Sequence, residues 1–205
     1  MNNYLVIFNT IKAFDKTIKI EGDKSLSIRW ALIASQAKGK SKSSNLLKSE
    51  DVMSTLHCLK KLGVKIKFKD DSCEIIGKGL NSFNYKKNLT LNSGNSGTLG
   101  RLIMGLLVHS KVEIKIVGDK SLSKRDFMRV VNPLKKFGAK FKTKKGKLPI
   151  SISGTSHPKS IKYFEKLGSA QCKSSVILAA LNTKGITTIK AKKSRDHTEL
   201  LLNYL

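Results

Sequence analysis

The residue types best suited to chemistry gather in Gly22–Arg29, which reads Gly-Asp-Lys-Ser-Leu-Ser-Ile-Arg and precedes an apolar run. A glycine lets the backbone approach a ligand, and a serine can cap a helix whose first-turn amides attract negative charge. Lys24 supplies a point charge, and Arg29 supplies a planar fork that fits a phosphate or a carboxylate. This stretch predicts an anion site at the start of a helix.

Related stretches occur further along the chain. A near copy, Gly-Asp-Lys-Ser-Leu-Ser-Lys-Arg, lies at Gly118–Arg125, and a small-residue turn at Ser93–Thr98 precedes a second apolar run. A single copy would favour the ordinary interpretation, a lysine-rich turn before a helix. Two copies together with the small-residue turn favour a function, although a plain turn remains the alternative for Ser93–Thr98.

The charge of the chain is extreme, with 40 basic against 14 acidic residues and a net charge of +26 over 205 residues. Such a balance indicates anionic partners, of which nucleic acid is one class, or a composition that uses lysine wherever a solvated residue serves. Arginine is scarce, and most of the arginines fall in the glycine- and serine-rich motifs, as expected where fork geometry matters. Aromatic residues are not interleaved with the basic ones as base stacking requires, so we expect only nonspecific nucleic-acid binding.

Several classes of site and location are disfavoured. The three cysteines are scattered without a CxxC pair, and the four histidines share no metal spacing, so we expect reduced thiols and no metal site. No apolar run reaches the length of a membrane helix, and the apolar run near the N-terminus is too short for a signal peptide. We therefore expect a cytoplasmic protein without a membrane partner.

The apolar pattern predicts two kinds of helix and a set of short strands. Nearly all-apolar runs predict buried helices at about 25–37, 99–109 and 176–181, the first of them ended by Gly39. Helical spacing and polar starts predict amphipathic helices at 50–62, 126–137 and 194–205. Strands are predicted at 4–8, 17–21, 64–68, 73–76, 89–91, 112–117, 139–142, 149–153 and 187–191.

These elements repeat with a period of roughly 70 residues. Ser25, Gly97 and Ser169 begin successive buried helices at equal spacing, and Leu59–Phe68 matches Leu134–Thr143 at six of ten positions. The predicted fold is therefore α/β, with repeated βαβαββ units around buried helices and a third unit that is truncated. Because the sequence ends on an apolar helical face, we expect it to be the front part of a longer protein.

Taken together, the motifs resemble those of the EPSP synthase family (5-enolpyruvylshikimate-3-phosphate synthase), in order and over nearly the whole chain. Each motif is weak alone, and five in order are strong. One departure is Asp126, where the family usually has proline, which we expect to change how that loop is held. The matching segments are Gly22–Arg29, Gly94–Thr98, Gly118–Arg125, Ser169–Gln171 and Ser194–Glu199.

The resemblance implies an inverse α/β fold with two domains of three units each and the substrates between them. Residues 1–21 would begin the first domain, and 22–205 would form most of the second, with units at about 22–80, 88–154 and 159–205. The implied reaction moves the enolpyruvyl group of phosphoenolpyruvate to the 5-hydroxyl of shikimate 3-phosphate without metal or organic cofactor. The full-length protein would be a monomer.

The resemblance also assigns residues to the two ligands. Lys24 and Arg125 would be catalytic, by stabilising charge in the transition state. Shikimate 3-phosphate would be held by Ser25, Arg29, Ser169, Ala170, Gln171 and Arg195. Phosphoenolpyruvate would be surrounded by Lys24, Asn95, Gly97 and Arg125, with Gln171 between the two ligands, and Thr98 would also be a substrate-binding residue.

The acid and base that proton transfer requires are not evident in this sequence. The family takes them from its C-terminal half, and the carboxylates present here fit helix caps and dipole partners better: Glu50, Asp51, Asp126, Asp196 and Glu199. We therefore expect the chain alone to be inactive. Two alternatives remain, a basic nucleic-acid-binding protein of the same fold and the UDP-N-acetylglucosamine enolpyruvyl transferase, whose first loop reads Lys-Asn where this chain has Lys24-Ser25.

Overall fold

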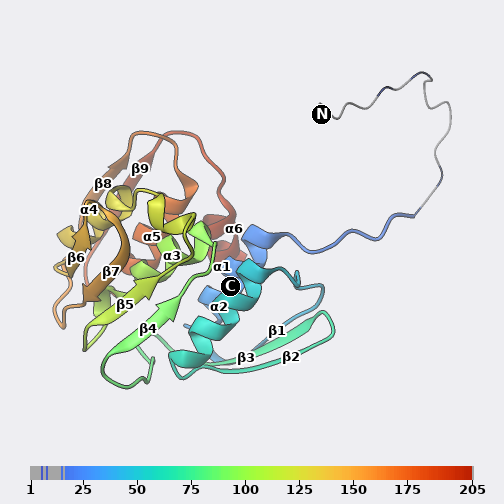
Figure 1. Ribbon diagram of the computed structural model, residues 1–205, viewed down its shortest axis with the longest axis horizontal. Coiled ribbons are helices and arrows are strands. Elements are labelled where there is room, and N and C mark those ends of the chain that lie inside the picture. Colours follow the sequence, from blue (N-terminus) through green and yellow to red (C-terminus); the bar gives the residue numbers. More distant parts are fainter. Residues whose placement is uncertain (1–5, 7, 9–14, 16, 205) are drawn as a thin grey trace.

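Six α-helices of two kinds are found in the computed structural model, which describes residues 6, 8, 15 and 17–204 (Figure 1). Three are largely buried: α1 (Lys24–Ala34), α3 (Gly97–Leu106) and α5 (Ala170–Ala180). Three are more exposed: α2 (Glu50–Lys61), α4 (Met128–Lys136) and α6 (His197–Tyr204). Two short 3₁₀ helices, η1 (Leu107–His109) and η2 (Leu122–Lys124), follow α3 and precede α4.

Nine strands form three sheets among the described residues. The first sheet is antiparallel with the order β1-β3-β2, from β1 (Lys38–Ser43), β2 (Lys65–Lys69) and β3 (Ser72–Lys78). The second has the order β4-β5-β7-β6, from β4 (Leu89–Asn92), β5 (Ile114–Val117), β6 (Lys140–Lys144) and β7 (Lys147–Ser153). The third pairs β8 (Lys162–Glu165) with β9 (Thr188–Ala191).

The sheets share one topology, which confirms the predicted repeat. In the second sheet β4 and β5 are parallel and joined through α3, while β5, β7 and β6 are antiparallel neighbours. The first sheet repeats the antiparallel part, and β8 and β9 repeat the parallel pair around α5. The second and third units therefore each place one helix between parallel strands, and among the described residues all three units have a more exposed helix after the strand that follows the buried helix.

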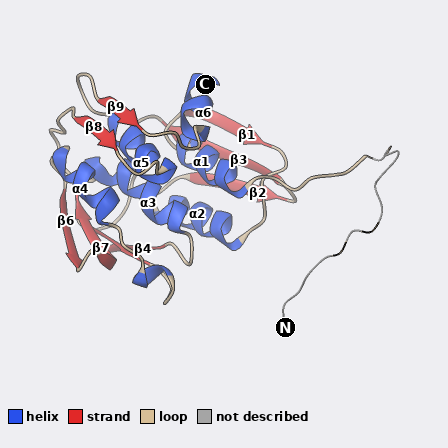
Figure 2. Cartoon of the chain, turned by 90° about the horizontal axis from the view of Figure 1, so that it is seen from above, coloured by secondary structure: helices blue, strands red, loops and turns tan. Residues whose placement is uncertain are grey.

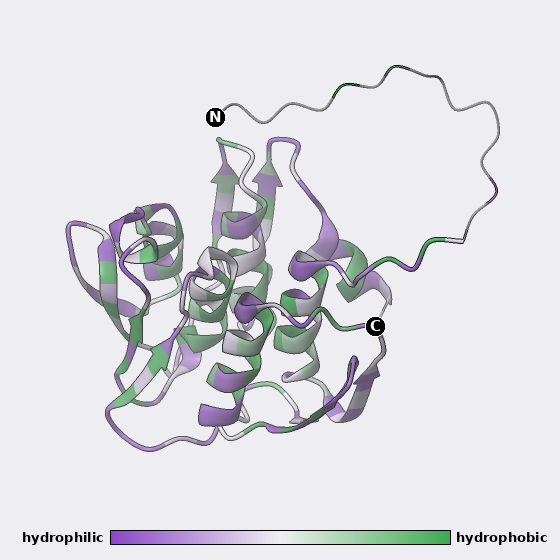
Figure 3. Cartoon of the chain, turned by 45° about the vertical axis from the view of Figure 1, so that its right-hand side comes forward, coloured by the Kyte–Doolittle hydropathy of each residue, from purple (hydrophilic) through white to green (hydrophobic). Residues whose placement is uncertain are grey.

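The core lies among the helices rather than on one side of a sheet. Figures 1 and 2 show α1, α3 and α5 at the centre with the three sheets outside, and Figure 3 shows apolar residues concentrated on the central helices. The closest crossing is that of α3 and α5, where a Cβ added at Gly105 would lie 2.2 Å from the carbonyl oxygen of Ser175. Glycine is required there because the two backbones nearly touch.

The structure differs from several predicted elements. Residues 17–23 form no helix or strand, and Ile18 and Ile20 are mostly exposed, so the strand predicted at 17–21 is wrong. The strand predicted at 4–8 lies largely outside the described residues. Helix α1 ends at Ala34, and Gly39 lies inside β1 with a φ of 96° instead of ending the helix. Strands β1 and β8 lie outside the predicted strands. β1 reads Lys-Gly-Lys-Ser-Lys-Ser and has no residue that favours a strand, whereas β8 has Tyr163 and Phe164 but is only four residues long.

Within the part of the chain that the structure describes, no helix is both long enough and apolar enough to cross a membrane.

Candidate anion-binding site

The three buried helices begin in the same way. Asp23, Ser96 and Ser169 are their N-caps, and each side-chain oxygen accepts a hydrogen bond from the backbone N–H three residues later, at 2.7, 3.2 and 3.3 Å. The remaining first-turn N–H groups and the helix dipole favour an anion at such an end. The sequence motifs therefore lie at equivalent places in the three units.

At the start of α1, the two basic residues of the motif have different surroundings. Lys24 is about half exposed, and its Nζ lies 3.1 Å from Oδ2 of Asp51 in the first turn of α2. Arg29 is buried, with 4% of its surface exposed. Its guanidinium donates to the Thr198 hydroxyl at 2.9 Å, to the Ser25 carbonyl at 3.1 Å and to the Ser174 hydroxyl at 3.4 Å.

Arg29 consequently connects the first motif to the last one. Burial, followed by the positive charge of Arg195, lowers the pKa of Arg29 from its ordinary value, whereas Glu199 and Asp23 act to raise it. Arg195 itself is exposed. The structure therefore places two arginines that were assigned to shikimate 3-phosphate near each other, although the guanidinium of Arg29 is directed at protein groups.

The turn before α3 brings a second group of predicted residues together. Nη2 of Arg125 donates to Oδ1 of Asn95 at 3.4 Å, and both side chains are exposed. The first carbonyl of α3, that of Gly97, accepts from Nη1 of Arg101 at 3.3 Å. A Cβ at Gly97 would lie 2.8 Å from Nη1 of Arg101 and 3.3 Å from Nη1 of Arg125. Glycine therefore leaves room for two guanidinium groups at this helix start.

The side-chain amide of Gln171, in the first turn of α5, is hydrogen-bonded through both its oxygen and its nitrogen. Its Oε1 accepts from Nη1 of Arg101 at 3.0 Å, and its Nε2 donates to the Thr98 hydroxyl at 3.0 Å. The starts of α3 and α5 are thus joined through a side chain that was assigned to both ligands. One hydrogen on Nε2 remains for another acceptor, since an amide nitrogen carries two.

Arg101 is the residue that sequence reasoning missed. Besides Gly97 and Gln171 it donates to the carbonyl of Asp126 at 3.1 Å, and its guanidinium stacks on the Phe127 ring with 4.7 Å to the centroid. Burial lowers its pKa. Arg101 lies outside the sequence motifs, and only the fold shows that it joins α3, α5 and the loop before α4.

The acidic residues near the site make structural contacts. Asp126, the departure from the family pattern, accepts from the N–H of Met128 at 2.8 Å through Oδ1. Helix α4 begins at Met128, two residues later than predicted, and its N-cap is Phe127. Asp51 pairs with Lys24, and Glu199 pairs with the buried Lys173. Among the described residues, no three histidine, cysteine, aspartate or glutamate side chains gather as a metal site.

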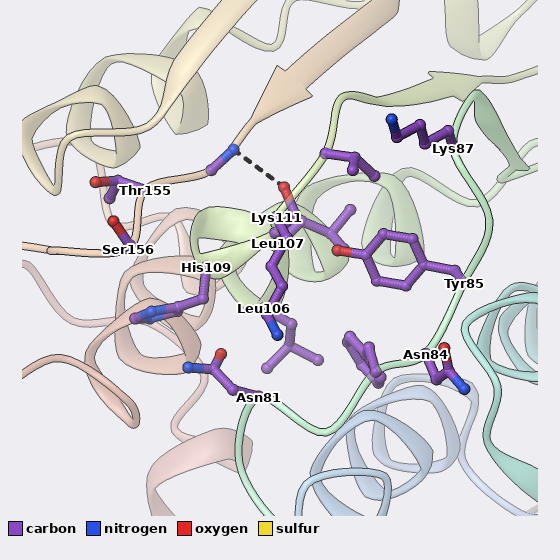
Figure 4. A pocket seen from close by; sticks show the side chains of 14 residues that line it. Asn81, Asn84, Tyr85, Lys87, Leu106, Leu107, His109, Lys111, Thr155 and Ser156 are labelled. Carbon is purple, nitrogen blue, oxygen red and sulfur yellow. Dashed lines mark hydrogen bonds between the residues drawn. The ribbon is translucent and has the colours of Figure 1, made fainter.

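A cavity lies elsewhere, at the opposite end of α3, and none of the predicted residues line it. Its volume is about 800 Å³ (Figure 4). The strand-connecting segments around residues 81–87, 106–112 and 154–156 form its walls. His109 lies in this wall, where its Nε2 is 3.3 Å from the carbonyl oxygen of Ala179 and burial lowers its pKa. His109 is therefore engaged with the end of α5.

Comparison with known proteins agrees with the motifs and the topology. The family described as EPSP synthase (3-phosphoshikimate 1-carboxyvinyltransferase) matches residues 8–205. The 3-phosphoshikimate 1-carboxyvinyltransferase of Ruthia magnifica subsp. Calyptogena magnifica is 46% identical over 187 residues, which are 90% of this chain and 42% of that protein. The one from Streptococcus pyogenes serotype M2 is 42% identical over 189 residues, 91% of this chain and 44% of its own length.

A solved structure of EPSP synthase from Acinetobacter baumannii superposes with a TM-score of 0.86 at 36% identity, over 91% of this chain and 42% of that one. This chain thus spans less than half the length of the relatives it matches. Five motifs in order, one repeated topology and the family match over almost all residues point the same way. The chain belongs to the EPSP synthase family.

Proposed function

We propose that this chain supplies the shikimate 3-phosphate side of an enolpyruvyl transferase site, in which the enolpyruvyl group of phosphoenolpyruvate moves to the 5-hydroxyl of shikimate 3-phosphate. The contact that carries the proposal is the Arg101–Gln171–Thr98 bridge, which joins the starts of α3 and α5 through a residue assigned to both ligands. The names of the relatives support the same reaction. Residues 1–21 would then begin one domain and 22–205 most of another.

Each assigned residue has a role that suits its position. Shikimate 3-phosphate would meet the first turns of α1 and α5 and the exposed Arg195, that is, Ser25, Arg29, Ser169, Ala170, Gln171 and Arg195. Phosphoenolpyruvate would lie nearer the start of α3, against Lys24, Asn95, Gly97, Thr98 and Arg125. Lys24 and Arg125 would stabilise negative charge as the enolpyruvyl group adds to the hydroxyl and phosphate then leaves.

The first test is turnover. We expect the purified chain to release no phosphate above a no-protein control when it is mixed with shikimate 3-phosphate and phosphoenolpyruvate, because the resemblance assigns the acid and base to residues outside this sequence. Phosphate release is followed directly. Sustained release by the chain would contradict the assignment of the acid and base to residues outside this sequence.

The second test is ligand recognition by NMR titration, with inorganic phosphate as the control. We expect shikimate 3-phosphate to bind no better than about millimolar, because a half-open surface offers it a few amides and charged side chains. Phosphoenolpyruvate should give almost no response. Arg29→Ala and Gln171→Ala should each weaken the shikimate 3-phosphate response, and Arg125→Ala should matter less. If inorganic phosphate produces the same shifts, or Arg125→Ala is the most damaging change, the residue assignment is wrong.

A further inference from the structure

A buried carboxylate lies directly before the loop that carries Ser169. Glu165 is the last residue of β8, and 4% of its surface is exposed. The proposed reaction assigns it no role, and it is one of only 14 acidic residues in a chain of net charge +26. A buried carboxylate is costly unless its oxygens are bound, so its partners indicate what it does.

The partners of Glu165 surround both of its oxygens. Oε1 accepts from the backbone N–H of Leu167 at 2.9 Å and from Nη2 of Arg129 at 3.4 Å. Oε2 accepts from the Tyr163 hydroxyl at 2.5 Å. Burial acts to raise the pKa of Glu165, but the hydrogen bonds from Tyr163, Leu167 and the Ser169 N–H, together with the charge of Arg129, lower it below its ordinary value. The carboxylate is therefore ionised at neutral pH.

These bonds close the loop between β8 and α5. The chain turns at Gly168, whose φ is 66°, and reaches the N-cap Ser169, whose Oγ accepts from the N–H of Cys172 at 3.3 Å. The N–H of Lys173 is bound to the carbonyl of Ser169. The first two N–H groups of α5, those of Ala170 and Gln171, are the ones that the helix itself cannot satisfy. Their direction depends on the backbone that the carboxylate holds.

Glu165 is also hydrogen-bonded to the neighbouring loop through its backbone. Its backbone carbonyl accepts from the N–H of Lys192 at 3.0 Å, at the start of the segment that leads to Arg195. Its partner Arg129 comes from α4, in the preceding unit. One residue thus fixes the Ser169 loop through its side chain and adjoins the Arg195 loop through its backbone.

We propose that Glu165 is a positioning residue for the anion site, and that its carboxylate holds the 166–169 loop so that the first amides of α5 face the ligand. The inference rests on the proposed function for the identity of the ligand, shikimate 3-phosphate. The contacts by which Glu165 holds the loop are present in the free protein, and they do not depend on the proposed function. Arg129 neutralises the carboxylate, so that its negative charge does not oppose the bound anion.

The experiment compares Glu165→Gln with the wild-type chain by amide hydrogen exchange and by NMR titration with shikimate 3-phosphate. The neutral amide keeps the shape but cannot accept from Leu167, Arg129 and Tyr163 together. We expect exchange at Leu167 and Ser169 to be about ten-fold faster and the affinity to fall by a similar factor, the size of one hydrogen bond to a charged group. Exchange at Leu102 and Ile103, in the middle of α3, should not change.

Two further variants separate positioning from general stability. Glu113→Gln removes an exposed carboxylate that pairs with Lys142 at 2.8 Å on the second sheet, and it should change neither the loop nor the affinity. Glu165→Asp keeps the negative charge but shortens the side chain, and should loosen the loop as Glu165→Gln does. It provides the test if Glu165→Gln does not fold.

The outcomes distinguish the two proposals. Unchanged exchange at Leu167 in the Glu165 variants, or faster exchange throughout α3, would overturn the positioning role. A looser loop with undiminished affinity would overturn it as well. If the wild-type chain gives no response to shikimate 3-phosphate, the proposed function fails, and the exchange data alone still decide whether Glu165 holds the loop.

Discussion

Several side chains at the candidate site are hydrogen-bonded to other protein groups rather than left open to a ligand. The sequence predicts that the guanidinium of Arg29 binds an anion. In the structure it donates to Thr198, Ser174 and a carbonyl of its own helix. Arg101 likewise donates hydrogen bonds to Gln171 and Gly97. Because an arginine carries five N–H donors in a fixed plane, it can position several groups at once. The scarce arginines in this lysine-rich chain lie where that geometry is used.

At this scale we predict that Gly97→Ala disturbs the site more than it disturbs the fold. The added methyl group would lie 2.8 Å from Nη1 of Arg101 and 3.3 Å from Nη1 of Arg125, and both are far ends of flexible side chains. The free energy of unfolding should fall by less than about 1 kcal/mol, since such ends can move aside. The NMR signals of the Gln171 side-chain amide should shift as its bond to Arg101 is displaced.

The matched control is Gly100→Ala, in the same helix, where the nearest atoms to an added Cβ, on Phe127 and Ser93, are at 3.4 Å. It should leave the Gln171 amide signals in place. Equal shifts in the two variants would show that the guanidinium groups are not held as described.

The relative position of α3 and α5 is set by how closely their backbones approach each other. Helices α3 and α5 cross with the Cα of Gly105 against the carbonyl of Ser175, and the Ser175 hydroxyl donates to the carbonyl of Arg101 at 2.9 Å. This crossing determines how far the two helix starts lie from each other. The Arg101–Gln171 bond depends on that distance, so the packing at one end of α3 and the site at the other are linked.

At the scale of elements we predict that Gly105→Ala is strongly destabilising. A Cβ 2.2 Å from a backbone oxygen cannot be accommodated by a side-chain rotation, so α3 and α5 must separate. The cost should be at least about 1–3 kcal/mol, the range for overpacking a core. Urea denaturation measures it, and Gly100→Ala again provides the control. A Gly105→Ala chain as stable as the Gly100→Ala chain would contradict the close crossing.

For the molecule as a whole, the net charge of +26 affects every encounter with an anion. Lysines cover the outer sheets, as in the alternating strands β2 and β6, whereas the arginines of the site lie at helix starts. The general field attracts polyanions without selecting among them, and selectivity comes from the organised groups at the starts of α1, α3 and α5.

We therefore predict that the chain binds oligonucleotides only at low salt. Between 50 and 200 mM salt the affinity for a labelled oligonucleotide should fall by about 10³-fold or more if several phosphates are contacted, and the sequence of the oligonucleotide should not matter. Fluorescence anisotropy measures both. Tight, sequence-dependent binding that persists at the higher salt would favour the nucleic-acid-binding alternative.

Local patterns in the sequence determined most elements and the places of the site residues. Helical spacing located α2 from Glu50, small polar residues located the starts of α3 and α5, and the period of roughly 70 residues gave the repeated topology. These features depend on neighbours within a few residues, which is why periodicity and capping rules find them. The family resemblance added the ligands and their residues, which remain proposals.

Only the tertiary structure decided which residues meet across the units. Lys38–Ser43 is a strand because β3 lies beside it, whereas Ile18 and Ile20, with a better strand pattern, pair with no strand in the part of the chain that the structure describes and remain exposed. The burial of Arg29 against Thr198, the bridge from Arg101 to Gln171 and the pairing of Arg129 with Glu165 join residues far apart in the chain. Strand pairing and buried hydrogen bonds are satisfied by whichever partner folding brings near, and a sequence pattern contains no record of that partner.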